Sequence, residues 1–299
     1  MKVGAFTIIT DPEYRQDPWK EGIGQMLEVF DHVVVVCGRS ADLPMVQQEF
    51  PSEKLHLLYL EWPQPEWSYQ ELPRHLNRGL ERLRELGCDW GVRLDVDTAV
   101  HEKDRGLLYA ALGLARGHGK WLARVEKYQF FKPTLCHEKG KMPLCVNLDA
   151  PIVYGFDFER YTDLCQPIEW NGKYTAIMHG VDTGVPAGRR PDDTKVFNTG
   201  IHVYNYDYTF KTEERAKELL YNFDRAHERF WGQGYTGKKG DEITPNTAMQ
   251  DFIDLSLGRY SRMMKPKAIK DHPKHFIPSL EALTYAQWGH SLWDKTVQG

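Results

Sequence analysis

The first hundred residues alternate short apolar runs with segments of helical periodicity. Residues 3–10 and 32–37 are rich in β-branched side chains, and the second run contains four consecutive valines, which suits a strand buried on both faces. Residues 19–30 and 71–86 instead carry apolar side chains at helical spacing. Two further short strands are predicted at residues 55–60 and 90–94.

This alternation predicts an α/β fold in which a mostly parallel sheet is flanked by helices. Right-handed crossovers place the carboxyl ends of parallel strands along one edge, which is where ligands of such sheets bind. Polar clusters follow the strands at Thr10-Asp11, Gly38-Arg39-Ser40 and Asp95-Val96-Asp97. We therefore expect these clusters to converge on one crevice.

The second half of the chain is less regular. Strands are predicted at 120–131 and 196–204, whereas residues 132–195 are rich in Pro, Gly, Asp and Trp and read as loops with short strands. Helices at 213–230 and 244–257, a glycine-rich loop at 232–240 and a last strand at 267–271 complete the predicted elements. In the second helix Thr244 is the expected N-cap, followed by Pro245.

Composition narrows the class of protein. The 299 residues include 38 basic and 42 acidic side chains, a formal net charge of -4, which argues against a surface coated in basic residues for binding nucleic acid. Aromatic residues make up 12%, as in a folded protein. No run approaches the roughly 20 apolar residues of a membrane span, and the N-terminus reads as a strand, so we expect a cytoplasmic protein. Five cysteines without CxxC spacing favour buried thiols over disulfides or zinc.

The sharpest local feature is Asp95-Val96-Asp97, directly after the apolar Leu94. On a strand, residues two apart point the same way, and carboxylates held so close repel each other. A divalent cation such as Mg²⁺ or Mn²⁺ removes that repulsion and prefers oxygen ligands. The alternative is a surface turn with two solvated aspartates, but the position at a buried strand end favours the metal site.

Residues 75–102 resemble the core signature of GT-A fold glycosyltransferases. Asn77-Arg78-Gly79 opens the resemblance and Leu94-Asp95-Val96-Asp97 closes it, as in family-two type members. The resemblance implies a GT-A, Rossmann-like sheet with an acceptor-side extension. It implies Mn²⁺ or Mg²⁺ held by Asp97, with Asp95 as a metal or ribose partner, and Asn77, Asp95 and Val96 in the nucleotide-sugar site.

The resemblance also assigns roles after the first two strands. Thr10, Asp11 and Tyr14 stand where the family binds the nucleotide base, and Tyr14 would stack on a uracil-like ring. Arg39 would contact the base or a phosphate.

Later matches to the family are shorter. Phe197-Asn198-Thr199-Gly200 resembles the Asn-x-Gly strand of retaining, glycogenin-like members, whereas Asn77-Arg78-Gly79 favours an inverting type, so the stereochemistry stays open. A late histidine commonly completes the metal shell in this family. His272 is the expected third ligand, with His275 as its alternative.

An inverting enzyme needs a general base for the acceptor hydroxyl. Asp241, with Glu242, follows the glycine-rich loop where the family places this base, and Asp251 is the second candidate. The alternative is that Asp241 and Glu242 only complement the dipole at a helix start. Closure of the 232–240 loop over the donor sugar would exclude water.

The expected protein is thus one GT-A domain, 1–299, with a nucleotide-binding half, 1–105, and an acceptor-binding half, 106–299. We expect it to transfer a sugar from a nucleotide-diphosphate sugar, in the first instance a UDP-sugar, to an acceptor hydroxyl. The acceptor stays open between a glycan, a protein, a lipid and a modified DNA base. Rival functions are a nucleotidyltransferase acting on sugar phosphates and a non-catalytic carbohydrate-binding protein. The lack of a glycine-rich phosphate loop at 10–19 counts against the nucleotidyltransferase.

Overall fold

The computed structural model describes ten ranges of the chain: residues 1–63, 71–132, 135–150, 152–155, 167–170, 173–177, 193–207, 209–234, 237–251 and 267–283. Parts of several predicted elements lie outside these ranges. They are the end of the 244–257 helix, the centre of the 232–240 loop and much of 132–195. The last predicted strand, 267–271, lies inside the described ranges.

Four parallel strands form the first part of the sheet, in the order β3-β2-β1-β4. The strands are β1 Val3–Ile9, β2 His32–Cys37, β3 Leu55–Tyr59 and β4 Trp90–Arg93. The connections between them contain the helices α1 Pro12–Arg15, α2 Trp19–Val29, α3 Asp42–Glu49 and α4 Glu71–Glu85. The predicted strands and the two long helices of this half are confirmed, with ends that differ by one residue or less.

The sheet continues through β7 Leu135–Asn147, β6 Leu122–Lys132, β11 Val196–Asn205 and β5 Thr98–Val100, and β12 Lys267–Ala268 pairs with β7. Strands β6 and β11 run parallel to each other and in the same direction as β1, whereas β7 and β5 run the opposite way. The described sheet is therefore mixed but mostly parallel, and the predicted α/β class is confirmed. A separate small sheet contains β8 Ile152–Gly155, β10 Lys173–Ile177 and β9 Pro167–Trp170.

Strand β7 corrects the prediction of loops with short strands at its position. Its sequence contains glycine, proline and several charged residues, and so lacks the apolar alternation of a strand. The strand forms because β4 and β6 supply hydrogen-bonding partners on both sides. Helix α5 Arg105–Gly117 and helix α3 are likewise absent from the predicted elements.

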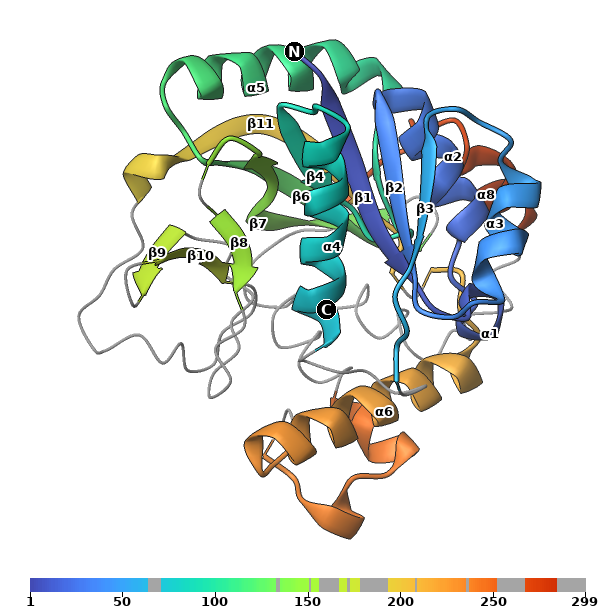
Figure 1. The fold of residues 1–299 in the computed structure, drawn as a ribbon. Helices are drawn as coiled ribbons and strands as arrows, with labels where there is room; N and C mark the ends of the chain where they lie inside the picture. Colours follow the sequence, from blue (N-terminus) through green and yellow to red (C-terminus); the bar gives the residue numbers. More distant parts are fainter. Residues whose placement is uncertain are drawn as a thin grey trace.

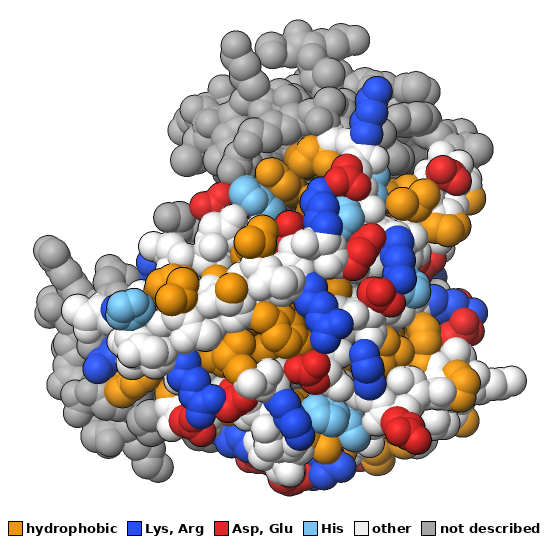
Figure 2. All heavy atoms as spheres, turned by 90° about the horizontal axis from the view of Figure 1, so that it is seen from above, with side chains coloured by type: hydrophobic (Ala, Val, Ile, Leu, Met, Phe, Trp, Pro, Cys, Tyr) orange, Lys and Arg blue, Asp and Glu red, His pale blue; other side chains and the backbone are white. Residues whose placement is uncertain are grey.

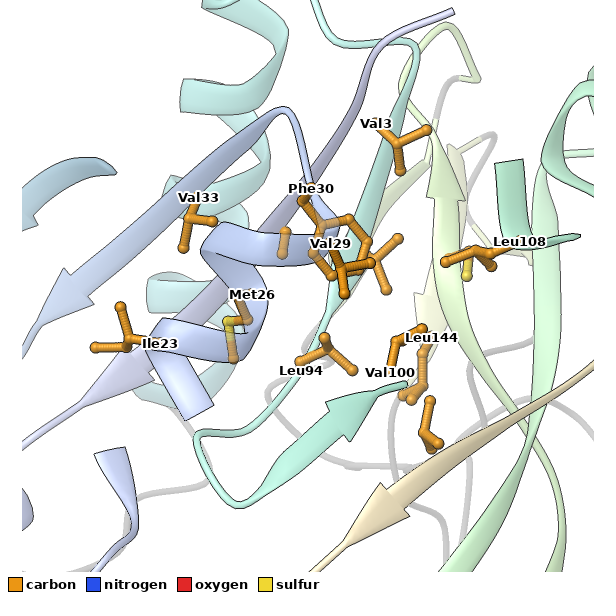
Figure 3. Close-up of a cluster of buried hydrophobic side chains, with 14 of the residues drawn as sticks. Val3, Ile23, Met26, Val29, Phe30, Val33, Leu94, Val100, Leu108 and Leu144 are labelled. Carbon is orange, nitrogen blue, oxygen red and sulfur yellow. The ribbon is translucent and has the colours of Figure 1, made fainter. Parts of the chain in front are cut away.

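Hydrophobic side chains cover both faces of the sheet. One cluster joins α2 and α5 to β1, β2 and β4, and Figure 3 shows Ile23, Met26 and Val29 of α2 beside Val33, Leu94 and Val100. A second cluster places Leu76, Leu80 and Leu83 of α4 on the opposite face (Figure 1). A third gathers Phe130, Tyr206 and Phe276 near α8 Ile277–Ala282. Leu94 and Val96 belong to the first cluster, so the turn after β4 is anchored in the core.

Helix α6 Glu213–Trp231 lies across the end of the molecule toward which β1, β2 and β3 point (Figure 1). Thr212 caps its start by accepting a hydrogen bond from the Arg215 backbone N–H at 3.3 Å. Gly232 ends it in the left-handed region, with φ of 75°. Thr244 also acts as the predicted N-cap, since its hydroxyl accepts from the Thr247 N–H at 3.2 Å. The described ranges also contain short 3₁₀ helices at Glu102–Asp104, Asp193–Lys195 and Gly240–Glu242.

The surface around α5 carries charges of both signs. Figure 2 shows Lys and Arg side chains interspersed with Asp and Glu over this face, in keeping with the small net charge. No helix in the described ranges has the length and apolar character needed to cross a membrane.

Candidate functional site

The carboxyl ends of β1 and β2 come together as predicted. The Arg39 guanidinium forms an ion pair with the Asp11 carboxylate, and the Gly38 N–H donates to the Ile9 carbonyl at 2.7 Å. Asp11 adopts a left-handed backbone with φ of 48°, and its N–H donates to the Asp42 carboxylate at 3.2 Å. The first two polar clusters of the sequence therefore form one continuous edge, with Thr10 beside Gly38.

Asp95 and Asp97 lie in a turn after β4 and not on the strand itself. Strand β4 ends at Arg93, and the Thr98 N–H donates to the Asp95 carbonyl at 2.8 Å to close the turn. The argument from strand alternation is therefore wrong for these two side chains. Asp95 is 63% exposed and faces Arg93, with 3.4 Å between Oδ1 and Nη2, whereas Asp97 is half-buried.

Strand β11 holds Asp97 from the opposite side. The Asn205 amide donates to Asp97 Oδ1 at 3.0 Å, and the Thr98 hydroxyl donates to the same oxygen at 3.0 Å. The Tyr206 N–H donates to the Asp97 carbonyl at 2.7 Å. The Gln129 amide in turn donates to Asn205 Oδ1. Sequence reasoning missed Asn205, although the Asn-Thr-Gly motif begins the same strand.

Asp97 stands in an electrostatically strained environment. Burial, followed by repulsion from Asp207 and Asp95, raises the pKa of its carboxyl to about 7, although the nearby Lys211 ammonium works in the other direction. Lys211 forms a buried ion pair with Asp17, with 2.6 Å between Nζ and Oδ1. Asp207 and Lys211 were not singled out by the sequence.

Asp95 and Asp207 each repel the Asp97 carboxylate, and carboxylate oxygens are the ligands that a hard divalent cation prefers. No group of three or more His, Cys, Asp or Glu side chains in the described ranges is arranged to hold a metal ion. Carboxylates are the ligand type that Mg²⁺ and Mn²⁺ prefer, but the described residues form no such metal-binding group.

His272 lies behind the Asp97 turn. Its ring is buried beside Phe130, and Nδ1 is 2.9 Å from the Tyr206 hydroxyl. The backbone N–H of the same tyrosine donates a hydrogen bond to the Asp97 carbonyl. The structure thus connects His272 to Asp97 through Tyr206. The backbone N–H of His275 donates to the Gln25 side chain at 3.4 Å.

The segment carrying Tyr14 is fixed to α6. The Tyr14 hydroxyl donates to Glu218, and the Arg215 guanidinium lies 3.7 Å from the centre of the Tyr14 ring. Gln16 accepts a hydrogen bond from the Thr212 N–H at 2.8 Å. The tyrosine is 44% exposed, so a surface of the ring stays accessible at this end of the sheet.

The last two predicted residues, Val96 and Asn77, have different places in the fold. Val96 is 5% exposed, and its carbonyl oxygen lies where a Cβ atom on Gly22 of α2 would stand. Asn77 is a half-buried residue of α4, two positions before Gly79, which contacts Phe6 of β1. Val96 therefore anchors the turn, while Asn77 belongs to the helix on the other face of the sheet.

The two candidate bases lie on the segment that follows α6. Asp241 is exposed in the 3₁₀ helix Gly240–Glu242, where the Glu242 carboxylate accepts from the Lys239 N–H at 3.1 Å. Asp251 pairs with Lys238 at 2.6 Å. Glu242 thus caps the short 3₁₀ helix Gly240–Glu242, whereas the role of Asp241 as base stays a prediction.

Comparison with known proteins gives no match in sequence, since no protein-family model and no curated protein matches the chain. Solved structures with likeness to it include TarS of Staphylococcus aureus, at a TM-score of 0.39 and 10% identity, covering 88% of this chain and 44% of TarS. A structure of TarS residues 1–349 with UDP-GlcNAc gives a TM-score of 0.39 and 11% identity, covering 88% of this chain and 73% of that one.

Two further structures belong to other bacteria. Rv0371c of Mycobacterium tuberculosis, in complex with manganese, has a TM-score of 0.38 and 11% identity, covering 73% of this chain and 97% of that one. A structure named as a nucleotide-diphospho-sugar transferase of Desulfovibrio desulfuricans has a TM-score of 0.32 and 10% identity, covering 50% of this chain and 65% of that one. The matched regions thus span less than two thirds of this last protein and of full TarS.

Proposed function

We propose that this protein is a metal-dependent glycosyltransferase that uses a nucleotide-diphosphate sugar. The observation that carries the proposal is the half-buried Asp97 carboxyl at the carboxyl end of β4, where Asp95 and Asp207 repel it. A divalent cation would relieve this repulsion, and the edge of an α/β sheet is where nucleotide ligands bind. The motif Leu94-Asp95-Val96-Asp97, with its likeness to GT-A enzymes, supports the same reading.

In this proposal Asp97 is the principal metal ligand and Asp95 a metal or ribose partner, with His272 still a predicted third ligand. Bound Mn²⁺ or Mg²⁺ would neutralise the diphosphate leaving group as a Lewis acid. Thr10, Asp11, Arg39 and Tyr14 would hold the nucleotide along the ends of β1 and β2. The Arg39–Asp11 ion pair orients the guanidinium toward this edge.

The reaction breaks the bond between the anomeric carbon and the diphosphate oxygen and forms a bond to the acceptor oxygen. The acceptor proton passes to a general base, for which Asp241 is the first candidate and Asp251 the second. The nucleoside diphosphate is the leaving group. A UDP-sugar donor, a cytoplasmic location and a single domain over 1–299 belong to the same proposal.

The test measures release of nucleoside diphosphate from a panel of nucleotide sugars, including UDP-GlcNAc, with Mn²⁺ or Mg²⁺ present. We expect turnover with at least one donor, and we expect Asp97→Ala to lower it by about 100-fold or more because leaving-group charge is no longer neutralised. Asp149→Ala is the matched control, because the Asp149 side chain is 67% exposed and pairs with Arg116 at the surface.

Products separate the rival functions. A nucleotidyltransferase would convert a nucleotide sugar and pyrophosphate into a nucleoside triphosphate and a sugar phosphate. A carbohydrate-binding protein would show no turnover and no thermal shift with UDP plus Mn²⁺. Full activity of a folded Asp97→Ala variant would also refute the proposed site. Circular dichroism of each variant verifies that a loss of turnover is not a loss of fold.

A further inference from the structure

Lys211 is a buried cation at the donor edge. Its side chain is only 4% exposed, and Nζ lies 2.6 Å from Asp17 Oδ1, itself 11% exposed. The residue stands directly before Thr212, the N-cap of α6. A lysine here is unfavourable on two grounds, because burial removes its hydration and the start of a helix carries positive partial charge.

Asp17 alone does not account for this placement. Its other carboxylate oxygen accepts from Arg15 Nε at 2.9 Å, so one carboxylate is shared by two cations. Asp207 and Asp97 supply the additional negative charge around Lys211. Asp207 follows Tyr206, whose N–H donates to the Asp97 carbonyl at 2.7 Å, and the Thr209 N–H donates to the Tyr206 carbonyl at 2.8 Å just before Lys211. Together with Asp17 they keep the pKa of Lys211 above its ordinary value although burial opposes this. The ammonium therefore stays charged and close to the proposed metal ligand.

We infer that Lys211 is a fixed cation of the donor site, which competes with the divalent metal for Asp97 and Asp207 and attracts the diphosphate of the bound nucleotide. The inference deepens the proposed function and depends on it. The ligand class it names is the complex of a divalent cation with a nucleoside diphosphate. The cation and the diphosphate carry opposite charges, so Lys211 affects them in opposite directions.

Removing the Lys211 charge should therefore change the affinities for Mn²⁺ and for the diphosphate in opposite directions. Without Lys211 the carboxylates attract Mn²⁺ more strongly, and the diphosphate loses a nearby positive charge. A residue that only supports the fold would weaken both ligands when replaced. Opposite changes in the two affinities distinguish the electrostatic role from a structural one.

The experiment compares wild type with Lys211→Met, a replacement of similar length without charge. Mn²⁺ affinity is measured alone by calorimetry, and UDP affinity is measured at saturating Mn²⁺. We expect Mn²⁺ to bind about fivefold or more tightly and UDP to bind about fivefold or more weakly. Lys217→Met is the matched control on α6, because Lys217 forms an exposed pair with Glu213 at 3.0 Å and should leave both affinities unchanged.

A second variant protects the test against unfolding of the first. Asp17→Asn combined with Lys211→Met removes both charges of the buried pair, and we expect it to keep the loss of UDP affinity. If wild type binds both ligands but Lys211→Met weakens both, or changes neither, the inference is wrong and the proposed function stands. If wild type binds neither Mn²⁺ nor UDP, the proposed function itself is wrong.

Discussion

At the scale of single residues, Asp97 connects stability to the proposed chemistry. Its carboxyl is held by Asn205 and Thr98 through one oxygen, while burial and the charges of Asp207 and Asp95 raise its pKa to about 7. A free aspartate titrates near pH 4. The folded protein therefore binds this proton more tightly than the unfolded chain, and it loses stability as the proton leaves.

The sign of the resulting pH dependence follows from linkage. Because the folded-state pKa of Asp97 is raised, the free energy of unfolding falls as pH rises from about 4 to about 7 and then levels off. Asp97→Asn removes the titrating group, so we expect it to be more stable than wild type at about pH 8 by on the order of 2 kcal/mol, with little difference near pH 4. Urea unfolding at both pH values measures this.

Asp149→Asn is the control for that comparison, since the side chain is 67% exposed. It should follow the wild-type pH dependence. A variant at position 97 that is no more stable than wild type above pH 7 would show that its carboxylate is not under strain in the folded protein.

At the scale of elements, the sequence pattern correctly predicted those helices and strands whose own residues determine their structure. The four valines of β2 and the leucines of α4 specify their own structure, and these elements were predicted within one residue. Helix α5 escaped prediction because its apolar residues are not confined to one face: Leu107 and Leu114 are 63% and 59% exposed. Strand β7 was not predicted because its structure depends on pairing with β4 and β6 more than on its own sequence.

Helix α2 positions the Asp95–Asp97 turn through a close backbone contact. A Cβ atom on Gly22 would collide with the Val96 carbonyl oxygen, which belongs to backbone that Leu94 and Val96 anchor in the core. We expect Gly22→Ala to lower the free energy of unfolding by about 1 to 3 kcal/mol, because neither the helix nor the turn can yield cheaply. Chemical denaturation measures the loss.

Gly106→Ala is the matched control in α5, where an added Cβ meets nothing within 4 Å. There alanine should stabilise the protein by about 0.5 to 1 kcal/mol through helix propensity. Equal effects of the two substitutions would mean that Gly22 is not required by the contact with Val96.

At the scale of the whole molecule, the site is assembled from distant parts of the chain. The motif at 95–97 was visible in the sequence because its residues are adjacent. Asn205 lies 108 positions from Asp97, and Lys211 lies 194 positions from Asp17, so nothing local marks either one. Only the pairing of β11 with β5 and the position of α6 bring them to the edge. Sequence reasoning thus singled out Asp95 and Asp97 of the candidate site but not Asn205 or Lys211.

The segment 269–283 closes this assembly by folding back onto the N-terminal half. Lys274 pairs with Glu28 of α2 at 2.9 Å, and Ser279 donates to Glu21 of the same helix. Phe276 is fully buried and stacks on Tyr206, with ring centres 4.5 Å apart. Tyr206 in turn donates its N–H to the Asp97 carbonyl, so this segment supports the proposed metal site from behind.

Phe276→Ala tests this long-range support. Because it removes a buried ring from the cluster around Tyr206, we expect a loss of about 3 to 5 kcal/mol in the free energy of unfolding. Under conditions where the variant stays folded, Mn²⁺ affinity should fall as well, because Tyr206 no longer holds the Asp97 turn in one position. Ile277→Ala is the control at the next residue, where the side chain is 39% exposed and the expected loss is small. A destabilised Phe276→Ala variant with unchanged Mn²⁺ affinity would show that the aromatic cluster stabilises the fold without positioning Asp97.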